Sequence, residues 1–378
     1  MPLNTIPNKG LTSRGYPSDR LVTPIIINGD MSVAQRGTSF SFNSSSGFTV
    51  DRFDFEQTSG ATGDCTITQE SDAPNNTGLV KSVKIAVDTA ETPTGGGNCV
   101  FQQKLEGFNC APLEHGQSSP PSATLSFWVK SNKTGTYSVQ IKGEGSTGRY
   151  VLFDYTISSA NTWEKKIITW VGDTSVALDY DSSRRLRVIW HLSSGPDDKV
   201  SPTSSWATSS LFQMSSNAVN FFDSASNEIY FTGVQLEVGE FDSTTIPSFP
   251  FESYESNLRK CQRYFETFPS NGGDGVIGYG YGSGSDTART MFPFKVTKRS
   301  APTMSDSLST SRQYRINFTA TDGTAVNQNS SNTPGFGSVC TLNSGYMNLS
   351  GFSSIGGGHN GFLIYNNSTT LLSADAEL

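Results

Sequence analysis

The sequence predicts an all-β protein with an N-terminal jelly-roll β-sandwich, a short bridging helix and a smaller C-terminal β-sandwich domain. Segments that alternate apolar and polar residues recur along the chain, and turns rich in Gly, Asn, Ser and Pro separate them. This spacing is typical of sandwiches and jelly rolls. Only one segment has clear helical periodicity, which argues against βαβ units and a parallel sheet. Charged residues make up 16% of the chain, against about 25% in ordinary globular proteins.

The N-terminal segment, 1–23, contains three prolines and two glycines but few apolar side chains. Such a segment cannot bury enough surface to offset the entropy lost on folding. We therefore expect an extended arm that docks onto a partner protein. The alternative is a flexible tail with no docking role.

Residues 24–250 form the predicted jelly roll. Its first strand, over 24–31, ends in Asn28-Gly29-Asp30, residue types that adopt the positive φ angles of a tight turn. An apolar-rich segment follows over 40–55. Further strands are expected over 65–68, 79–87, 99–105, 123–130, 136–141, 150–157, 163–170, 186–192, 220–222 and 228–238.

The last of these strands leads into the helix candidate. Its alternation slips by one residue at Gly233, which indicates a β-bulge. Two prolines follow, and then a helix is expected over 253–265 with Ser253 or Ser256 as its N-cap. Its apolar residues recur at helical spacing: Leu258, Cys261 and Phe265. This helix joins the two predicted β units.

Residues 251–269 therefore form the bridging helix and linker, and 270–378 form the C-terminal β domain. The C-terminal domain opens with a Gly-, Ser- and Asp-rich loop over 269–286 that carries Tyr279 and Tyr281. Strands are expected over 290–296, 313–319, 337–342, 345–349 and 361–365.

Charge and hydropathy exclude two classes of partner. The net charge is −7 and the sequence pI is about 5.1, so a broad basic face for nucleic acid is not expected. The chain lacks a run of about 18 apolar residues, so membrane insertion is not expected either. Because the N-terminus has no apolar core of the signal-peptide kind, we expect synthesis in a host cytoplasm without classical export.

The cysteines and histidines do not indicate a metal site or a catalytic site. The five cysteines form no CxxC pair, which argues against a zinc site. Cys99 and Cys110 are close enough in sequence to pair across a hairpin, but cytoplasmic synthesis favours free buried thiols. With three histidines in the whole chain, a Ser-His-Asp or His-metal mechanism has few residues to draw on.

Four short motifs resemble a known family. In chain order they are INGDM with QRG (27–31 and 35–37), FTVDRF (48–53), VQLEVG (234–239) and CQRYF (261–265). The combination resembles tail-fibre and other appendage proteins of tailed bacteriophages, and the resemblance covers residues 24–268. It implies a jelly roll similar to a carbohydrate-binding module, followed by a variable C-terminal domain.

The resemblance also implies a role. The chain would be a virion structural protein, usually a homotrimer in phage fibres, whose arm binds other virion proteins and which attaches the particle to a bacterial surface glycan. One alternative is a head or tail decoration protein with no receptor role. Another is a glycan depolymerase, which needs two carboxylates facing each other across a groove. No motif singles out such a pair, so we expect no enzymatic activity.

Glycan binding needs flat aromatic rings for the apolar faces of sugars and polar side chains for their hydroxyls. Trp206 lies in a Ser- and Thr-rich segment, and Tyr279 and Tyr281 lie in the Gly-rich loop, so these three residues are the candidates. Alternatively, Trp206 folds back onto the sandwich and the tyrosines pack at a subunit interface.

The resemblance also implies a structural Ca²⁺ ion. Jelly rolls of the resembled kind often hold such an ion near their first and last strands. Asp30 and Glu237 occupy those neighbourhoods, and oxygen ligands suit Ca²⁺. The alternative is that Asp30 only caps a turn and Glu237 faces solvent.

Overall fold

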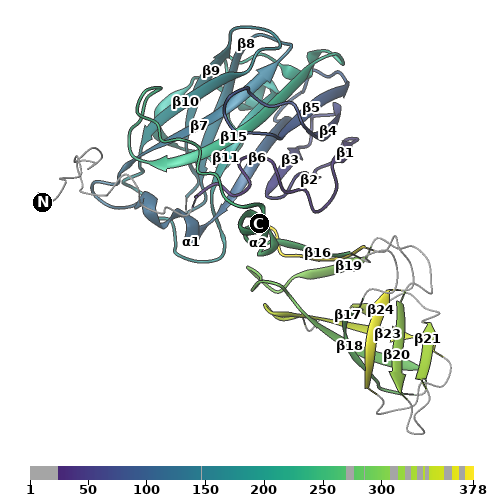
Figure 1. Cartoon of the computed structure of the whole chain (residues 1–378). Helices are drawn as coiled ribbons and strands as arrows, with labels where there is room; N and C mark the ends of the chain where they lie inside the picture. Colours follow the sequence, from purple (N-terminus) through teal and green to yellow (C-terminus); the bar gives the residue numbers. More distant parts are fainter. Residues whose placement is uncertain are drawn as a thin grey trace, which may run out of the picture.

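The computed structural model describes residues 24–145, 147–269, 276–284, 286–306, 314–319, 325–329, 335–336, 340–352, 360–365 and 371–378. It consists of a large β-sandwich and a smaller β unit, with helix α2 (Tyr254–Gln262) at the junction between them (Figure 1). The predicted all-β fold class is confirmed. Within the described residues, the strand pairs are antiparallel except for the short pair β12–β14. The expected N-terminal arm, 1–23, lies outside the described residues.

The first layer of the sandwich is a six-stranded antiparallel sheet. Its strands, in spatial order, are β1 (Ser39–Phe42), β4 (Asp64–Glu70), β5 (Ser82–Thr89), β15 (Glu228–Val238), β7 (Ser122–Ser131) and β10 (Glu164–Val171). In β15 the pairing with β7 shifts between Thr232 and Gln235, and Gly233 has a φ of 59°. The predicted β-bulge at Gly233 is therefore confirmed.

The second layer has seven strands. In spatial order they are β13 (Thr203–Thr208), β9 (Arg149–Ile157), β8 (Gly135–Gly143), β11 (Arg184–Ser194), β6 (Asn98–Glu106), β3 (Phe53–Gln57) and β2 (Gly47–Phe48). Side chains alternate across each strand, so Val188 and Trp190 of β11 enter the core while Arg187 and His191 face the other side. Aromatic rings fill the space between the layers: Phe101, Phe127, Trp190 and Phe231 contact one another.

Short elements complete the sandwich. A parallel pair, β12 (Lys199–Val200) and β14 (Met214–Ser215), lies outside the two layers. Helix α1 (Gly107–Cys110) runs into the 3₁₀ turn η1 (Ala111–Leu113), and η2 covers Pro196–Asp198. The expected strand over 220–222 is wrong: this segment is the 3₁₀ turn η3 (Phe221–Asp223), because the Asn220 side chain caps the Phe222 amide.

The expected first strand over 24–31 is also wrong. The Gln103 side-chain amide accepts from the Ile27 amide and donates to the Ile27 carbonyl, so a side chain takes the place of a partner strand. The tight turn that follows is as predicted. Asn28 has a φ of 60°, and the Met31 amide donates to the Asn28 carbonyl at 2.9 Å.

Helix α2 is shorter than the predicted 253–265. Its N-cap is Ser253, whose hydroxyl accepts from the Ser256 amide, as expected. The helix ends at Gln262 because Phe265 already pairs with Asp375 in a β-sheet. Cys261 and Tyr264 pack against Ile27 and Val33, which fixes the helix to the start of the sandwich.

The C-terminal unit contains two sheets. The smaller has the order β16 (Phe265–Pro269), β25 (Leu371–Asp375), β19 (Thr303–Asp306). The larger has the order β21 (Ala325–Asn329), β20 (Tyr314–Thr319), β24 (Asn360–Tyr365), β17 (Val276–Gly282), β18 (Thr287–Pro293), β23 (Ser344–Ser350), β22 (Gly335–Phe336). Its buried cluster includes Phe268, Phe292, Met347 and Leu372.

Two expectations for this unit need correction. The Gly-rich stretch expected as a loop contains strand β17, because its glycines and tyrosines alternate with the period of a strand. Part of the expected strand 337–342 lies outside the described residues, and 340–342 are not strand. Cys65, Cys99, Cys110 and Cys261 are buried free thiols, so the hairpin disulfide between Cys99 and Cys110 does not form. Within the described part of the chain, no helix is long and apolar enough to span a bilayer.

We expect acid to destabilise the sandwich through His191. This side chain is fully buried, and burial lowers its pKa from 6.5 to about 3. A histidine with a depressed pKa contributes stability above pH 6.5, and this stability is lost as pH falls from 6.5 towards 3. At pH 4.5 the loss is about 2–3 kcal/mol.

Urea unfolding of the wild type and of His191→Gln at pH 7.5 and pH 4.5 measures this contribution. The variant should lose less stability between the two pH values than the wild type. Parallel losses in both proteins would show that His191 is not the group that titrates.

Candidate functional site

The two predicted tyrosines lie on one exposed sheet face. Tyr279 and Tyr281 are two residues apart on β17, so their side chains point to the same side, with exposed fractions of 68% and 43%. Tyr279 pairs with Met291 of β18 and Tyr281 pairs with Arg289. Both rings are therefore exposed, and they lie on a strand instead of in the expected loop.

Strand β23 extends the same face. Met291 pairs with Tyr346, and Arg289 pairs with Asn348. Two rows of side chains therefore cross three neighbouring strands. We call this surface the tyrosine platform; its rows are Tyr279–Met291–Tyr346 and Tyr281–Arg289–Asn348.

The two rows differ in chemistry. The first offers the ring of Tyr279 and the thioether of Met291, which is 61% exposed. The second offers a phenol, a guanidinium and an amide. A hydrogen bond with Tyr281 raises the pKa of Arg289, so the guanidinium stays charged. The Tyr346 hydroxyl donates to Asn348 Oδ1 at 2.9 Å. The platform thus places an apolar row beside a hydrogen-bonding row.

The opposite side of the sheet holds the platform in place. Ala288, Thr290 and Phe292 of β18 are buried, and Thr290 Oγ1 donates to the Met347 carbonyl at 3.2 Å. A Cβ atom on Gly278 would lie 2.7 Å from the Met291 carbonyl oxygen, so only glycine fits this close approach of two strands. The tyrosines therefore stand on a packed sheet.

The sequence did not single out Arg289, Met291, Tyr346 or Asn348. The signal that could have found the first two is their alternation with buried Ala288, Thr290 and Phe292. The predicted strand began at residue 290, one position too late to include Arg289. Their pairing with β23 joins segments that are distant in sequence, which spacing alone does not predict.

Trp206 does not join the platform. It lies on β13 of the sandwich, and its indole Nε1 donates to the Val171 carbonyl at 2.7 Å. Its ring stands edge-on to the His115 ring, with 5.1 Å between centroids. Trp206 therefore folds back onto the sandwich, which was the alternative reading of its sequence context.

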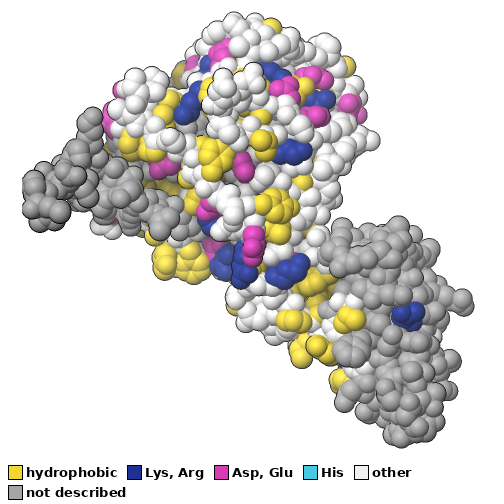
Figure 2. Space-filling view, in the orientation of Figure 1, with side chains coloured by type: hydrophobic (Ala, Val, Ile, Leu, Met, Phe, Trp, Pro, Cys, Tyr) yellow, Lys and Arg dark blue, Asp and Glu magenta, His cyan; other side chains and the backbone are white. Residues whose placement is uncertain are grey.

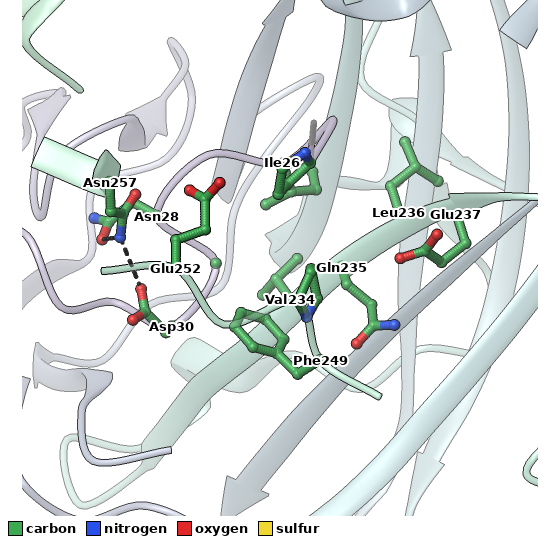
Figure 3. Close-up of a pocket in the computed structure, with 13 residues that line it drawn as sticks. Ile26, Asn28, Asp30, Val234, Gln235, Leu236, Glu237, Phe249, Glu252 and Asn257 are labelled. Atoms are coloured by element: carbon green, nitrogen blue, oxygen red, sulfur yellow. Dashed lines mark hydrogen bonds between the residues drawn. The ribbon is translucent and has the colours of Figure 1, made fainter. Parts of the chain in front are cut away.

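Asp30 and Glu237 line the same small cavity beside α2 (Figure 3). Its volume is about 30 Å³, which is room for about two water molecules. The two carboxylates lie towards opposite ends of the cavity, with Val234 and Gln235 between them (Figure 3). Both candidate Ca²⁺ ligands therefore line one cavity, but their carboxylates do not face each other.

The donor set does not fit Ca²⁺. Asp30 Oδ1 accepts from the Ser32 hydroxyl at 3.0 Å and from Asn257 Nδ2 at 3.1 Å, so it fastens α2 to the first turn. Burial raises the pKa of the Glu237 carboxyl, and this group lies at the other end of the cavity from Asp30. Within the described ranges, no group of three or more Asp, Glu, His or Cys side chains is arranged to hold a metal ion, whereas Ca²⁺ takes about six to eight oxygens.

We therefore expect metal removal to leave stability unchanged. Thermal unfolding midpoints with EDTA and with added Ca²⁺ should agree, and atomic emission of the purified protein should find no stoichiometric metal. A midpoint that rises with Ca²⁺ would establish the ion site that the resemblance implies.

The outer face of the seven-stranded sheet is covered by its own chain. Lys142 Nζ donates to the Ser210 carbonyl at 2.6 Å, and the Arg187 guanidinium lies 5.0 Å from the Phe212 ring centroid. Gln140 and His191 beneath this segment are fully buried. This face therefore presents less surface to a partner than the tyrosine platform does.

The junction between the sandwich and the C-terminal unit fixes the orientation of the platform relative to the sandwich. Arg52 is 1% exposed and forms an ion pair with Glu377, and its guanidinium lies 3.5 Å from the Tyr264 ring centroid. Arg36 also pairs with Glu377, at 3.4 Å, and stacks on the Phe265 ring at 3.5 Å. Figure 2 shows Lys and Arg side chains gathered where the bodies meet. We call this arrangement the joint.

Further contacts of the joint involve the same motifs. Arg263 and the Tyr264 hydroxyl both donate to the buried carboxylate of Glu106. Arg299 donates to the carbonyls of Ala376 and Glu377, each at 2.8 Å. The QRG, FTVDRF and CQRYF motifs thus meet at the last residues of the chain, and the spacing of these motifs did not indicate that Glu377 completes this cluster.

We expect Glu377→Gln to destabilise the protein by about 3–5 kcal/mol, because it leaves the buried Arg52 charge without its counter-charge. Urea unfolding measures this loss. The matched control is Glu240→Gln, since Glu240 is exposed and surface changes usually stay within about 0.5 kcal/mol. Equal midpoints for both variants would mean that the Arg52–Glu377 pair contributes little.

No family model matches this chain, and no curated protein matches it. Among solved structures, the enzymatically active domain of tailspike protein 4 from bacteriophage CBA120 aligns with 57% of this chain at 17% identity and a TM-score of 0.31. The chain covers 21%, about a fifth, of that structure.

Two sugar-binding structures are also similar. A putative sugar-binding protein from Bacteroides thetaiotaomicron aligns at 13% identity over 57% of this chain and 100% of its own, with a TM-score of 0.31. The N-terminal cellulose-binding domain of Cellulomonas fimi β-1,4-glucanase C aligns at 12% identity over 58% of this chain and 99% of its own, with a TM-score of 0.29.

Proposed function

We propose that this chain is a non-catalytic glycan-binding protein and that the tyrosine platform is its binding surface. The observation that carries the proposal is the row Tyr279–Met291–Tyr346, in which Tyr279 and Met291 are exposed, beside a row of hydrogen-bonding side chains on a packed sheet. Sugar rings have apolar faces that stack on aromatic side chains and hydroxyls that need polar partners. A surface with both features in adjacent rows suits such a ligand.

The spacing of the rows supports this ligand class. Tyr279 and Tyr281 are two strand residues apart, which is about 6.5–7 Å along β17. That separation lets one sugar ring lie on Tyr279 while its hydroxyls reach the row of Tyr281 and Arg289. The charge of Arg289 also favours sugars that carry an acidic group.

The platform offers no chemistry for cleaving a glycosidic bond. Glycoside hydrolysis uses a pair of carboxylic acids, and none of the six platform residues is acidic. We therefore propose binding without hydrolysis. New reducing ends after incubation with a polysaccharide would instead support a depolymerase.

We further propose that the chain is a tail-fibre or appendage protein of a tailed phage virion, assembled in the host cytoplasm. Support comes from the four motifs, three of which build the joint that holds the platform away from the sandwich. The N-terminal arm would bind other virion proteins, and a homotrimer is the expected oligomer.

Antibody labelling of intact particles tests the location, and light scattering tests the trimer. A decoration protein without a receptor role would label particles but leave adsorption unchanged when deleted.

Tyr281→Ala should weaken binding to bacterial surface polysaccharide up to about tenfold, because it removes a phenol that hydrogen-bonds the sugar hydroxyls, and one hydrogen bond contributes about 0.5–1.5 kcal/mol. Arg289→Gln should weaken binding as well, most for acidic glycans. The control is Tyr254→Ala, since Tyr254 is an exposed tyrosine (59%) on α2, outside the platform.

Glycan arrays and titration calorimetry measure these changes. Unchanged affinity in Tyr281→Ala would contradict the platform as the site. If this variant instead changes the oligomeric state in light scattering, the platform is a subunit interface.

A further inference from the structure

We infer that the sandwich carries a second ligand site, a cavity between two of its loops that takes a single neutral sugar residue. One loop covers 107–119 and the other covers 172–183. The inference rests on the proposed function, because it assigns a second point of glycan contact to the same chain. Figure 2 shows exposed hydrophobic side chains at this end of the sandwich, around α1.

The cavity is large enough for a small ligand. Its volume is about 540 Å³, and ligand pockets in proteins usually measure about 300–1,000 Å³. Its lining combines apolar groups with polar ones: Ala111, Leu178, Tyr180, His115, Gln117 and Ser118. This mixture suits a ring with an apolar face and several hydroxyls better than it suits a lipid or an ion.

Backbone hydrogen bonds tie the two loops together. The Gly107 amide donates to the Ser183 carbonyl at 3.0 Å, and the Phe108 amide donates to the Asp181 carbonyl at 3.0 Å. Further along, the Gly116 amide donates to the Asp173 carbonyl at 2.7 Å. Gly116 has a φ of 85°, and a Cβ atom there would lie 2.7 Å from the Ala177 backbone. The walls are therefore held in position before a ligand arrives.

Tyr180 gives the cavity an aromatic wall. The side chain of Tyr180 is 71% exposed, which is unusual for a large aromatic residue. The Phe108 ring, 39% exposed, meets it edge-on at a centroid distance of 4.7 Å, which limits its rotation. An exposed aromatic ring held by a second ring at the mouth of a cavity is an arrangement that stacks well on a sugar.

His115 supplies an unpartnered polar group. It lines the cavity and is 6% exposed, and its Nε2 atom has no hydrogen-bond partner among the described residues. Buried polar atoms of this kind are costly, so each one needs an explanation. A ligand hydroxyl that enters the cavity can act as its partner, because a hydroxyl both donates and accepts.

The charges around the cavity favour a neutral ligand. Burial lowers the pKa of His115 to about 4, so the ring is neutral at physiological pH. Burial also raises the pKa of the Cys110 thiol, which stays protonated. The described lining residues include no Lys or Arg that could pair with an acidic sugar. This preference differs from that of the platform, where Arg289 favours acidic sugars.

Two sites on one chain would raise the affinity for a polymer. Once one site holds the chain of sugars, the other binds in an intramolecular step at a high effective concentration. The sandwich site alone would then bind a free monosaccharide weakly, in the millimolar range.

The test uses the full chain and a panel of free neutral hexoses and N-acetylhexosamines, up to about 50 mM, which covers millimolar affinities. Tryptophan fluorescence is a direct readout, because Trp206 contacts His115. We expect one class of sugar to change the emission of the wild type. Tyr180→Ala should weaken this binding at least about tenfold, and Ser118→Phe, which fills the cavity without adding a tryptophan, should abolish it.

Tyr281→Ala separates this inference from the proposed function. It should leave the monosaccharide response unchanged while it weakens polysaccharide binding. No response of the wild type to any sugar of the panel would overturn the second site. A response that survives both Tyr180→Ala and Ser118→Phe but disappears in Tyr281→Ala would also overturn it, and would leave the platform as the proposed glycan site.

Discussion

A buried ion pair between Arg52 and Glu377 connects the beginning of the sandwich to the end of the chain. Both side chains are almost fully buried, so each charge would be costly without the other. Arg52 also lies on the Tyr264 ring and donates to the Lys104 carbonyl at 2.6 Å. One guanidinium thus contacts the sandwich, the bridging segment and the last residues together.

The rest of the C-terminal unit is arranged around this pair. Glu377 follows β25, which is the central strand of the small sheet and pairs with β16 on one side and β19 on the other. The Ala376 amide donates to the Tyr264 carbonyl at 2.7 Å. The chain therefore enters the C-terminal unit and leaves it at the same place. Because both ends of the unit are held there, the sheet with the tyrosine platform has a defined direction relative to the sandwich.

The contacts of the joint also explain why the motifs contain arginine. Arg36 and Arg52 lie in motifs near the start of the chain, and Arg263 lies in the helix motif, yet each meets an acidic or aromatic partner from elsewhere. Arginine suits these positions because its planar guanidinium can pair with a carboxylate and stack on a ring at once. A lysine would keep the charge but lose the stacking on Tyr264 or Phe265.

The sequence by itself determined the fold class, the order of most strands, the bulge at Gly233, the N-cap at Ser253 and the tyrosines that form part of the candidate site. These features depend on local alternation, propensity and turn residues, which are written in consecutive positions. The tertiary structure decided what joins segments distant in the chain. It placed the Gln103 side chain against Ile27 and turned Trp206 back onto the sandwich. It also set Arg289 and Asn348 beside Tyr281, and it brought Glu377 to Arg52. Such contacts depend on how sheets pair and pack, and no local pattern records that pairing.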